Sequence, residues 1–565
     1  MNPFVDYLNS LRTQDGATNP NYVEENRAEY LARVRTAHPW FPSDEELRVS
    51  TRIANLVRAM RDDGFPLDLV FLTGDAGDGK TAACVDLARA EGVEPPLRPI
   101  DRAGRFAIVK DASENPEAEL LATIAHSRRT HEPLLVAINE GRLRRLARAP
   151  ELRDAWTDVI EPGLAAWIDE ARADRLDAAM RARRLGVVNF RHRMHVRGVV
   201  PALLKSWTRA EYWEGNSSCA TCPARESCPI LANVSSLRDG GAVGRLTDVL
   251  ALAHFSGQRL PFRRLQGILA FIVTGALDCK DVLAGHDRSL SDRFYSLLFQ
   301  REVRGRARPE PAARVLAAAD PGLTPEPTND ARIASWLREP TADIPEFERR
   351  FLAVQGGRRS VDVFRALRRL AAFQGPARGR TRWREALDLL TRYVVDGNGE
   401  PLLHVVVAAL NRLHRHPTTD DEALVSHQIE PGAFRDPARA SLELDLGSRF
   451  TVELTRGPVL PPLVRDWLES CPSDVELLAW PAGAPHAENP ARLRLDARLL
   501  SLLLEVEDGY GFLPALGTYR RELARFHAHL SSLVDPARVA IVVRGGEHAW
   551  RLGGTGDKLR FIGEG

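Results

Sequence analysis

The stretch that decides the fold is Leu69-Val70-Phe71-Leu72-Thr73-Gly74-Asp75-Ala76-Gly77-Asp78-Gly79-Lys80-Thr81. From Gly74 onward it fits the pattern G-x-x-x-x-G-K-[ST] at every position. The apolar run before the loop predicts a buried strand, and residues 82–90 after it predict a helix. Glycines let the backbone curl so that its N–H groups face an anion, and the helix adds its positive N-terminus. The sequence therefore predicts a phosphate-binding loop.

Two side chains of the loop have predicted roles at a bound nucleotide. Lys80 is expected to reach the β- and γ-phosphates of ATP, and the Thr81 hydroxyl to ligate Mg²⁺. The chain has 77 basic residues, of which only five are lysines. One of these five stands at the position that the pattern requires, which supports the prediction. The other loop residues expected to bind the nucleotide are Gly74, Asp75, Ala76, Gly77, Asp78 and Gly79.

Three further apolar runs, 106–109, 134–138 and 185–188, suit buried strands of a parallel sheet, and helical stretches separate them. Strands that alternate with helices in this way predict an α/β fold with a doubly wound parallel sheet. An ATPase with a phosphate loop needs a carboxylate at the tip of a neighbouring strand. Polar residues that directly follow the predicted strands are therefore the candidates for catalysis.

Glu140 is the preferred candidate for the catalytic carboxylate. It lies within Asn139-Glu140-Gly141 and follows a more apolar run than its rival Asp111 does. There it would polarise the attacking water. Asn139, counted among the nucleotide-binding residues, stands where an aspartate usually faces the metal. Because asparagine carries no negative charge, we expect weak metal binding or slow hydrolysis. Asp111, which follows 106–109, is the rival candidate.

Three more polar residues follow the last predicted strand of the sheet. Asn189 follows the run 185–188 and is expected to sense the γ-phosphate; a cap at the end of the strand is the alternative interpretation. Arg191 and Arg193 come shortly after it. One interpretation is that these arginines face a phosphate bound to this chain or to a neighbouring copy. The alternative is that they are solvated.

A cysteine cluster interrupts the helical pattern between 205 and 300. Three of the six cysteines fall within ten residues, with the spacing C-x2-C-x5-C: Cys219, Cys222 and Cys228. A C-x2-C turn aims two thiolates at one tetrahedral centre, which predicts structural Zn²⁺. Cys279 is the expected fourth ligand, with His254 in reserve; an iron–sulfur cluster and unliganded thiols are the alternatives. The other two cysteines are expected to be packing residues: Cys84 and Cys471.

The segment 349–384 is strongly basic. It contains eleven arginines, a single acidic residue, Asp362, and four interleaved aromatic residues. Such a segment suits the phosphates of a nucleic acid, with aromatic rings that could stack on exposed bases. The alternative is a helix face whose arginines pair with acids elsewhere in the chain.

The composition is that of an ordinary globular protein: of 565 residues, 44% are hydrophobic and 27% are charged. The 77 basic and 76 acidic residues nearly cancel, which excludes a globally basic nucleic-acid binder. Six cysteines are too few for a disulfide scaffold. No apolar run approaches the roughly 18–20 residues of a membrane helix, and the start shows no signal peptide. We therefore expect a cytoplasmic protein that does not bind membranes.

The pattern along the chain predicts six segments. Ser43 is a predicted helix N-cap in the polar start. Seven prolines mark an irregular stretch over 305–345, and Ser441 to Leu454 alternates like a hairpin around 446–448. The segments are an N-terminal helical segment (1–65), a core with the phosphate loop (66–205), the cysteine cluster with a helical lid (206–300), a Pro-rich linker or insertion (301–345), an Arg-rich helical segment (346–396) and a C-terminal α+β domain (397–565).

The order of these features resembles a known family. The phosphate loop is followed by Asp111-Ala112-Ser113, Asn139-Glu140-Gly141, Asn189, Cys228-Pro229-Ile230, Asn233, Leu493-Arg494-Leu495-Asp496 and Gly509-Tyr510. Together these resemble the AAA+-like ATPases of bacterial DNA-phosphorothioation-dependent restriction and related anti-phage systems. The resemblance spans most of the chain. It implies an AAA+-like P-loop NTPase fold and an ATPase subunit that works with a helicase or nuclease partner.

We thus expect an ATP-binding and ATP-hydrolysing subunit of a defence complex, which couples nucleotide state to DNA engagement or to assembly. The expected cofactors are ATP, Mg²⁺ and Zn²⁺. The expected partners are other subunits of the system, DNA and further copies of this chain. Two other classes remain open: a nucleotide-gated signalling scaffold that hydrolyses slowly, and an AAA+ factor that remodels proteins.

Overall fold

A computed structural model gives the coordinates of the chain. It describes residues 1–11, 24–165, 168–193, 196–214, 218–256, 259–285, 289–300, 302–303, 306–307, 316, 320–323, 327–339, 343–354, 360–374, 382–413, 424–429, 441–469, 474–481, 489–509, 517, 519–533, 540–545, 548–555 and 558–564. The chain divides into two compact units. The first contains 1–254, 258–379 and 458–471, and the second contains 255–257, 380–457 and 472–565.

The core of the first unit is a five-stranded sheet with the order β2-β3-β4-β1-β5. Its strands are Ile100–Ala103 (β2), Phe106–Val109 (β3), Leu134–Ala137 (β4), Leu69–Thr73 (β1) and Leu185–Asn189 (β5). β1 is parallel to both of its neighbours, β4 and β5, and β3 is parallel to β4. Every residue of β1, β3, β4 and β5 is buried. Such continuous burial is expected when helices cover both faces of a sheet.

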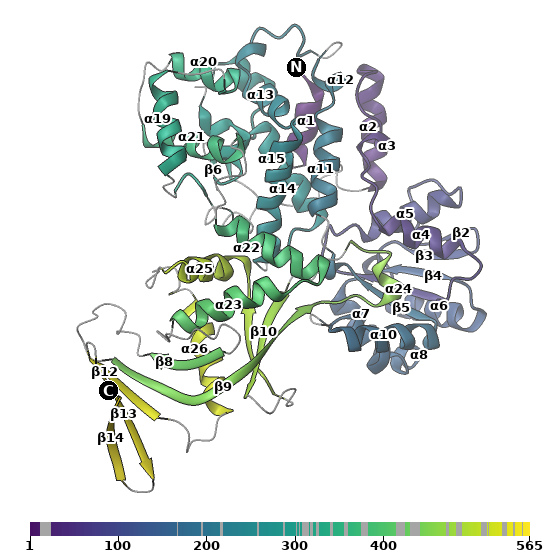
Figure 1. Cartoon of the computed structure of the whole chain (residues 1–565). Helices are drawn as coiled ribbons and strands as arrows, with labels where there is room; N and C mark the ends of the chain where they lie inside the picture. Colours follow the sequence, from purple (N-terminus) through teal and green to yellow (C-terminus); the bar gives the residue numbers. More distant parts are fainter. Residues whose placement is uncertain are drawn as a thin grey trace. The chain divides into compact units, whose positions relative to one another are not determined.

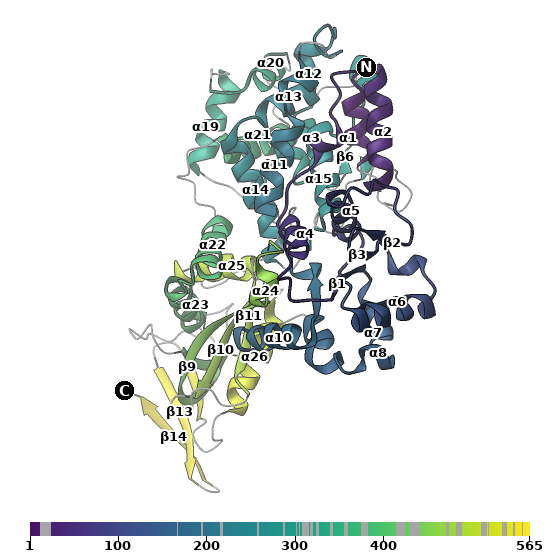
Figure 2. The same cartoon turned by 90° about the vertical axis from the view of Figure 1, so that its right-hand side faces the viewer.

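The helices between these strands lie on both faces. β1 leads into Lys80–Ala90 (α5) and on to the β2–β3 hairpin; β3 leads through Glu117–Thr130 (α6) to β4. Between β4 and β5 lie Glu140–Leu146 (α7), Pro150–Arg153 (α8), Glu161–Gly163 (α9) and Glu170–Arg183 (α10). The chain runs one way along the sheet from β1 to β3 and then returns to β5. Right-handed crossovers place the two sets of helices on opposite faces, and Figures 1 and 2 show α5 on one side and α7 and α8 on the other.

This topology creates a crevice next to the phosphate loop. β1 and β4 are neighbouring parallel strands, and the helices that follow them lie on opposite faces of the sheet. The carboxyl ends of two such strands separate, and α/β proteins bind their ligands there. The loop Gly74–Gly79 follows β1, and Asn139-Glu140 follows β4, so both sequence candidates lie at this crevice.

The α/β fold and its four predicted strands are confirmed, but the sheet is mixed. β2 is an additional strand that pairs antiparallel with β3, from Ile100 opposite Val109 to Ala103 opposite Phe106. Three of its four residues are not buried. It therefore lacks the continuous apolar run that identifies the other four strands. The predicted parallel sheet thus ends in an antiparallel edge strand.

Helices form most of the remainder of the first unit. Those before the sheet are Pro3–Ser10 (α1), Glu24–Ala37 (α2), Asp44–Leu47 (α3) and Ile53–Arg61 (α4). Those after it are Val196–Trp207 (α11), Ala210–Trp213 (α12), Pro229–Ser236 (α13), Gly240–Phe255 (α14), Phe262–Thr274 (α15), Cys279–Leu283 (α16), Phe294–Leu297 (α17), Pro327–Arg338 (α19), Glu346–Val354 (α20) and Val361–Gln374 (α21).

Two local signals explain particular helix starts. Ser43 caps α3, as predicted, because its hydroxyl accepts a hydrogen bond from Glu46 N while its own N–H donates to the Glu46 carboxylate. α19 lies inside the stretch predicted as an irregular linker. It begins at Pro327, and proline is tolerated at the first position of a helix because the missing N–H would have no partner there.

The second unit contains a seven-stranded sheet whose strand pairs are all antiparallel. The order is β11-β10-β9-β12-β13-β14, and β8 also pairs with β9. The strands are Leu424–Ile429 (β8), Ser441–Gly457 (β9), Asp474–Pro481 (β10), Ala491–Leu495 (β11), Ala540–Gly545 (β12), His548–Thr555 (β13) and Lys558–Glu564 (β14). The helices of this unit include Arg382–Thr391 (α22), Glu400–Leu413 (α23), Ala497–Glu507 (α25) and Arg520–Ser532 (α26).

The predicted hairpin around 446–448 is wrong, because β9 is one continuous strand of 17 residues. Its first part pairs with β12, where Asp445 lies opposite Ala540, and its last part pairs with β10, where Phe450 lies opposite Pro481. The alternating pattern does belong to a strand. Its partners, however, are three other strands, β8, β10 and β12, and the stretch does not fold back on itself at 446–448.

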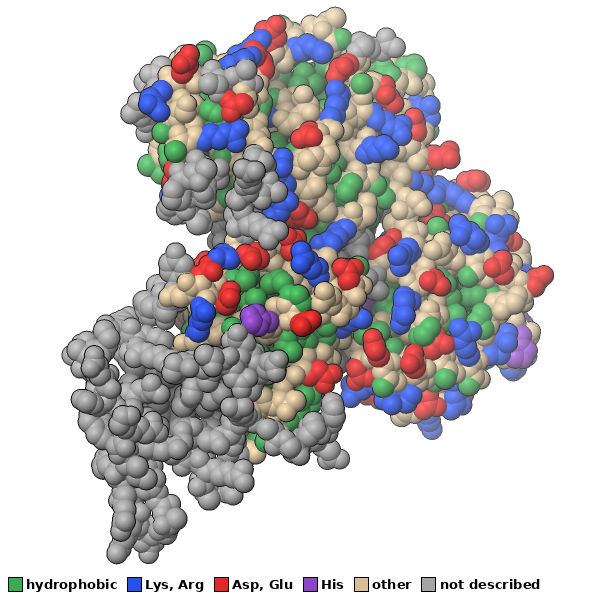
Figure 3. All heavy atoms as spheres, in the orientation of Figure 1, with side chains coloured by type: hydrophobic (Ala, Val, Ile, Leu, Met, Phe, Trp, Pro, Cys, Tyr) green, Lys and Arg blue, Asp and Glu red, His purple; other side chains and the backbone are tan. Residues whose placement is uncertain are grey.

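The surface carries both signs of charge. In Figure 3, Lys and Arg side chains are interspersed with Asp and Glu over the described face, in keeping with 77 basic and 76 acidic residues in the whole chain. Within the described ranges, no helix combines the length and the apolar character that crossing a membrane would require.

Candidate functional site

The phosphate loop has the backbone conformation that its glycines permit. Gly77 and Gly79 have φ angles of +85° and +97°, in the left-handed region that other residues avoid. A Cβ atom on Gly77 would lie 2.8 Å from the Cβ atom of Arg263 at the start of α15. Arg263 N also donates a hydrogen bond to the Gly77 carbonyl at 3.2 Å. The loop is therefore closely packed against α15, and Gly77 has no space for a side chain.

Several backbone N–H groups of the loop lack an acceptor within the described part of the chain. Among the described residues, no acceptor is found for the N–H groups of Gly77, Gly79, Lys80 and Thr81. These groups lie at the N-terminus of α5, where the helix dipole favours negative charge. An anion with several oxygen atoms would supply the missing acceptors.

The Lys80 side chain lies over the loop. Its Nζ donates to the carbonyl oxygens of Gly74 at 3.0 Å and Asp75 at 2.7 Å. Burial lowers the pKa of the Lys80 ammonium, and the charges of Asp78 and Asp111 oppose this shift. A phosphate could replace the two carbonyl groups as the partner of Nζ, because a charged acceptor binds an ammonium more strongly than a neutral one.

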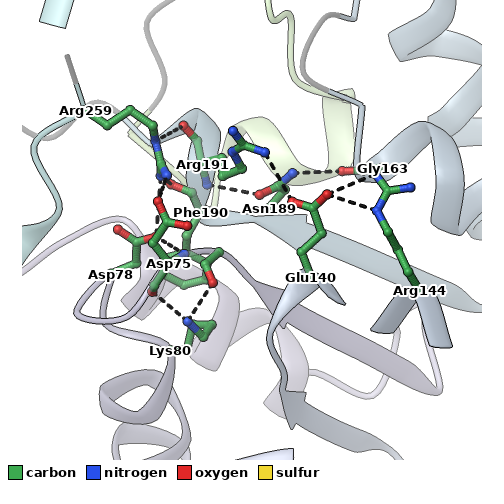
Figure 4. A network of polar contacts seen from close by, with 11 residues as sticks. Asp75, Asp78, Lys80, Glu140, Arg144, Gly163, Asn189, Phe190, Arg191 and Arg259 are labelled. Carbon is green, nitrogen blue, oxygen red and sulfur yellow. Dashed lines mark hydrogen bonds and ion pairs between the residues drawn. The ribbon is translucent and has the colours of Figure 1, made fainter. Parts of the chain in front are cut away.

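Arg259 neutralises two carboxylates of the loop, as Figure 4 shows. Its Nη1 forms an ion pair with Asp75, and its Nη2 lies 3.4 Å from Asp78 Oδ2. The same guanidinium donates to the carbonyl oxygens of Phe190 and Arg191, each at 3.2 Å. Burial raises the pKa of Asp78, and Arg259 acts in the opposite direction. Arg259 thus reduces the repulsion that Asp75 and Asp78 would exert on a bound phosphate.

Glu140 lies at the start of α7, directly after β4, and two arginines hold its carboxylate. Arg144 Nε donates to Oε1 at 3.0 Å, and Arg191 Nη1 lies 3.3 Å from Oε2 (Figure 4). Arg191 comes from the far side of β1, after β5. Asn139 is exposed and forms no side-chain cap on α7. The structure therefore places Asn139 and Glu140 beside the loop, and the Glu140 carboxylate already forms two ion pairs.

Asp111 lies close enough to Lys80 to act on it. It follows β3, and its Oδ1 accepts hydrogen bonds from Ser113 N at 2.8 Å and Ser113 Oγ at 2.6 Å. The charge of Asp111 raises the pKa of Lys80, against the effect of burial. The Thr81 hydroxyl lies 3.5 Å from the carbonyl oxygen of Lys110, the residue before Asp111. Asp111 is therefore on the side of the loop where Thr81 would hold a metal.

Asn189 uses its amide within the protein. Its Nδ2 donates to the Gly163 carbonyl at 3.3 Å, and its Oδ1 accepts from Arg191 N at 3.0 Å (Figure 4). This is the cap at the end of β5 that the sequence analysis leaves open as the alternative. Arg191 is paired with Glu140, and Arg193 is buried with its side chain paired to Glu469. Neither arginine is simply solvated in this structure.

Two of the predicted zinc ligands contact Asn2, and a third, Cys228, lies near enough to both for their charges to act on it. Asn2 N donates to Cys279 Sγ and Asn2 Nδ2 to Cys219 Sγ, both at 3.3 Å. The charges of Cys219 and Cys279 both act on Cys228, whose pKa burial raises to about 12. Cys222 N donates to the carbonyl of Cys219 at 3.4 Å, within a tight turn. Residues separated by about 60 positions are thus brought to one place.

This cysteine cluster does not have the geometry of a metal site as it stands. In the described part of the chain, no group of three or more His, Cys, Asp and Glu side chains is arranged to hold a metal ion. Cys84 is buried against the sheet, as predicted for a packing residue, and Cys471 lies outside the described residues. His254, the reserve ligand, lies beside Arg259 and Asp78 in a small cavity at the phosphate loop.

Asn233, one of the residues behind the family resemblance, has a structural role in this fold. It is completely buried, and its Oδ1 accepts from Arg293 Nη1 at 2.5 Å and from Phe294 N at 2.8 Å. Arg293 is itself paired with the buried Glu348. This network joins α13, α17 and α20.

The described arginines of the basic segment mostly face acids of the chain itself. The pairs are Arg349 and Arg350 with Glu346, Arg365 with Asp362, Arg368 with Asp330, Arg369 with Asp320 and Arg382 with Glu385. Phe373, one of the interleaved aromatic residues, is buried against Phe294. These contacts favour the alternative interpretation, a helix face paired within the protein. Arg358, Arg359, Arg378 and Arg380 lie outside the described residues.

Sequence reasoning missed Arg259, Arg144 and Asn2. None of them stands at a fixed spacing from the phosphate loop or the cysteines, and arginine is too common in this chain to draw attention. Comparisons of the chain with protein-family models, with curated proteins and with solved structures gave no match.

Proposed function

We propose that the chain is a P-loop NTPase of the AAA+-like kind that binds and hydrolyses ATP with Mg²⁺. The observation that carries the proposal is the set of N–H groups at the start of α5, next to Lys80, for which the described residues supply no acceptor. These donors face the crevice between β1 and β4, where a mostly parallel sheet of this order would hold a ligand. The sequence pattern and the backbone geometry therefore support the same anion site.

In this proposal the residues around the loop have separate roles in phosphoryl transfer. Lys80 and the N–H groups of the loop hold the phosphates, and Arg259 keeps Asp75 and Asp78 neutralised. Mg²⁺, held by Thr81 and by Asp111 on the same side, would supply positive charge to the phosphate oxygens. Glu140 orients and polarises the attacking water. Because Arg144 and Arg191 hold the Glu140 carboxylate, it must exchange one of these partners for water before it can act.

We also propose that Cys219, Cys222, Cys228 and Cys279 bind one Zn²⁺. The support is the convergence of distant cysteines and the two Asn2 donors, since N–H groups that donate to sulfur stabilise thiolate ligands. Metal binding would deprotonate Cys228, a thiol that burial otherwise keeps protonated. Small movements of the 218–228 turn would be needed to close the site.

In the cell, we propose that the chain is the ATPase subunit of a bacterial anti-phage or restriction complex in the cytoplasm. The support is the resemblance carried by the phosphate loop and the motifs that follow it. A helicase or nuclease subunit, DNA and further copies of the chain are the proposed partners. A slow signalling scaffold and a protein-remodelling factor remain the other candidates.

One experiment separates these candidates. ATP turnover by the full chain is measured alone, with duplex DNA, and with the proteins encoded beside it. Stimulation by DNA supports the defence ATPase, and stimulation by protein without DNA supports a remodelling factor. Tight ATP binding with negligible turnover in every mixture supports the scaffold. No turnover and no ATP binding would overturn the proposal.

A further inference from the structure

The segment 458–469 connects two strands of the second unit but packs in the first. β9 ends at Gly457 and β10 begins at Asp474, while the described residues between them belong to the unit of the parallel sheet. A short helix, Pro462–Arg465 (α24), lies within the segment. Four of its side chains are at most 4% exposed and join the core of that sheet: Leu460, Val464, Trp467 and Leu468. Their burial fixes the segment on the first unit.

Hydrogen bonds fix the beginning of the segment as well. Val459 N donates to the Ile168 carbonyl at 2.7 Å, and Leu463 N donates to the Asp177 carboxylate at 2.6 Å. Both acceptors lie in or just before α10, the helix that leads into β5. The segment is thus held by backbone contacts in addition to its apolar side chains.

The end of the segment reaches the phosphate loop through one side chain. Glu469 Oε2 lies 2.9 Å from Arg193 Nε, and Arg193 Nη1 donates to the backbone carbonyl of Asp78, in the loop, at 3.1 Å. The other oxygen of Glu469 accepts from Arg52 N at 2.5 Å. The Arg193 side chain is only 4% exposed. A buried guanidinium needs a counter-charge, and Glu469 supplies it here.

Arg193 also retains one free donor. Its Nη2 is buried and has no hydrogen-bond partner in the described structure. It lines a cavity of about 10 Å³, which would hold roughly one water molecule. The other residues that line the cavity include Asp78, Val196, His254 and Arg259. Arg193 Nη2 therefore faces a space that could hold one water molecule next to the loop.

Phosphate binding would change the hydrogen bonds of the loop. Lys80 now donates to two carbonyl oxygens of the loop, Gly74 and Asp75, and Asp75 N donates to Asp78 Oδ2 at 2.7 Å. A phosphate that takes Lys80 as its partner releases those carbonyl groups. Arg193 holds the backbone carbonyl of Asp78 in this same loop.

We propose that 458–469 is a tether that couples nucleotide binding at the phosphate loop to the second unit, with Arg193 and Glu469 as positioning residues. The proposal rests on the proposed function, because it requires nucleotide at the loop. Nucleotide that shifts Asp78 shifts Arg193 and Glu469, and Glu469 is five residues before β10. Coupling of this kind is reciprocal: a ligand of the second unit that moves β9 and β10 changes nucleotide affinity by the same factor.

The first test is amide hydrogen exchange of the wild-type full chain, with and without a non-hydrolysable ATP analogue and Mg²⁺. We expect nucleotide to change exchange in 458–469 and in the flanking strands β9 and β10. Changes confined to the phosphate loop and α5, at saturating nucleotide, would overturn the tether while leaving the proposed function intact. Failure of the wild-type chain to bind the analogue would instead contradict the proposed function.

The second test is Glu469→Gln, which removes the counter-charge of Arg193 and keeps the side-chain shape. We expect nucleotide affinity to fall by at least about five-fold, the lower end of typical coupling, and the exchange change in β9 and β10 to disappear. Glu476→Gln is the matched control, because it breaks an exposed pair with Arg492 in β10 and β11; it should leave both readouts unchanged. Wild-type affinity and exchange in a folded Glu469→Gln variant would overturn the proposal. If Glu469→Gln does not fold, the wild-type exchange experiment still decides it.

Discussion

Asp111 and Glu140 are the two acids that compete for the chemistry at the phosphate loop, and their surroundings differ. The charge of Asp111 raises the pKa of Lys80. The backbone carbonyl of Lys110, the residue before Asp111, accepts a hydrogen bond from the Thr81 hydroxyl. Glu140 is held by Arg144 and Arg191. We therefore assign Asp111 to the metal side of the loop and Glu140 to the attacking water.

Glu140→Gln and Asp111→Asn test this division of roles. Glu140→Gln should leave ATP affinity near the wild-type value and slow turnover by about 10²–10⁴-fold, because the water loses its polarising carboxylate. Asp111→Asn should instead weaken ATP binding only when Mg²⁺ is present. Steady-state turnover and ATP affinity with and without Mg²⁺ are the measurements. Wild-type turnover in Glu140→Gln, together with loss of turnover in Asp111→Asn at saturating Mg²⁺, would transfer the catalytic role to Asp111.

The loop could be predicted residue by residue because its pattern is local. Gly77, Gly79, Lys80 and Thr81 are fixed by one short stretch of sequence, and no tertiary information is needed to place them. Arg259 could not be predicted, since only the fold brings α15 and the residues before it to the loop. Asn189 shows the same limit, because its amide caps the end of β5 in this structure and the sequence could not decide between that and a phosphate contact.

At the scale of elements, α21 shows why a basic segment need not bind nucleic acid. Arg369 forms two hydrogen bonds to the Asp320 carboxylate, at 2.8 and 2.5 Å, and both side chains are largely buried. Arg365, on the same helix, is nearly half exposed and lies 3.9 Å from Asp362. Local sequence gives the charge of the helix, but the acids that neutralise it lie elsewhere in the chain.

Arg369→Ala should therefore destabilise the protein by about 3–5 kcal/mol, because it leaves Asp320 buried without a counter-charge. Arg365→Ala removes an exposed pair and should cost less than about 1 kcal/mol. Thermal and denaturant unfolding of the first unit measure both. A DNA affinity whose salt dependence is flatter in a well-folded Arg369→Ala variant would contradict the structural role of this arginine.

The cysteine cluster makes a prediction about a second element, the turn 218–228. Protein purified without added metal should contain about one zinc per chain, and Cys279→Ser should lower the zinc content and the stability of this region together. Cys84→Ser is the control, because Cys84 lies in the core of the sheet and away from the cluster. Elemental analysis decides the question. Iron with visible absorbance would indicate a cluster, and absence of metal from the wild-type chain would contradict the proposal.

The elements themselves were predictable to different degrees. The four parallel strands have continuous apolar runs, so their positions follow from the sequence. β2 lacks such a run, because three of its four residues are not buried, and the sequence therefore does not predict it, although it pairs with the next strand along the chain. β9 shows the right alternation, but it pairs with β8, β10 and β12 and not with itself. Alternation shows that a segment is a strand, whereas the choice of its partners is a tertiary property.

At the scale of the whole molecule, the chain is made of two units, and a segment between two strands of the second unit belongs to the first. The sequence predicts a nucleotide-binding α/β core and a separate C-terminal part rich in strands. It gives no sign that 458–469, which lies between two strands of the second unit, packs in the core of the first. Neither Glu469 nor the apolar residues before it form a pattern that indicates a function. Only the fold shows that Glu469 contacts Arg193, which in turn contacts the phosphate loop.

The central claim is that the loop at the start of α5 binds nucleotide, and calorimetric titration of the full chain with ATP and Mg²⁺ tests it most directly. We expect one ATP per chain, no detectable binding by Lys80→Ala, and unchanged binding by Lys205→Ala, which removes an exposed lysine of α11. The charge on Nζ is lost in the first variant, whereas the loop is untouched in the control. A wild-type chain that binds no nucleotide, or a Lys80→Ala variant that binds ATP as tightly as wild type, would contradict the account.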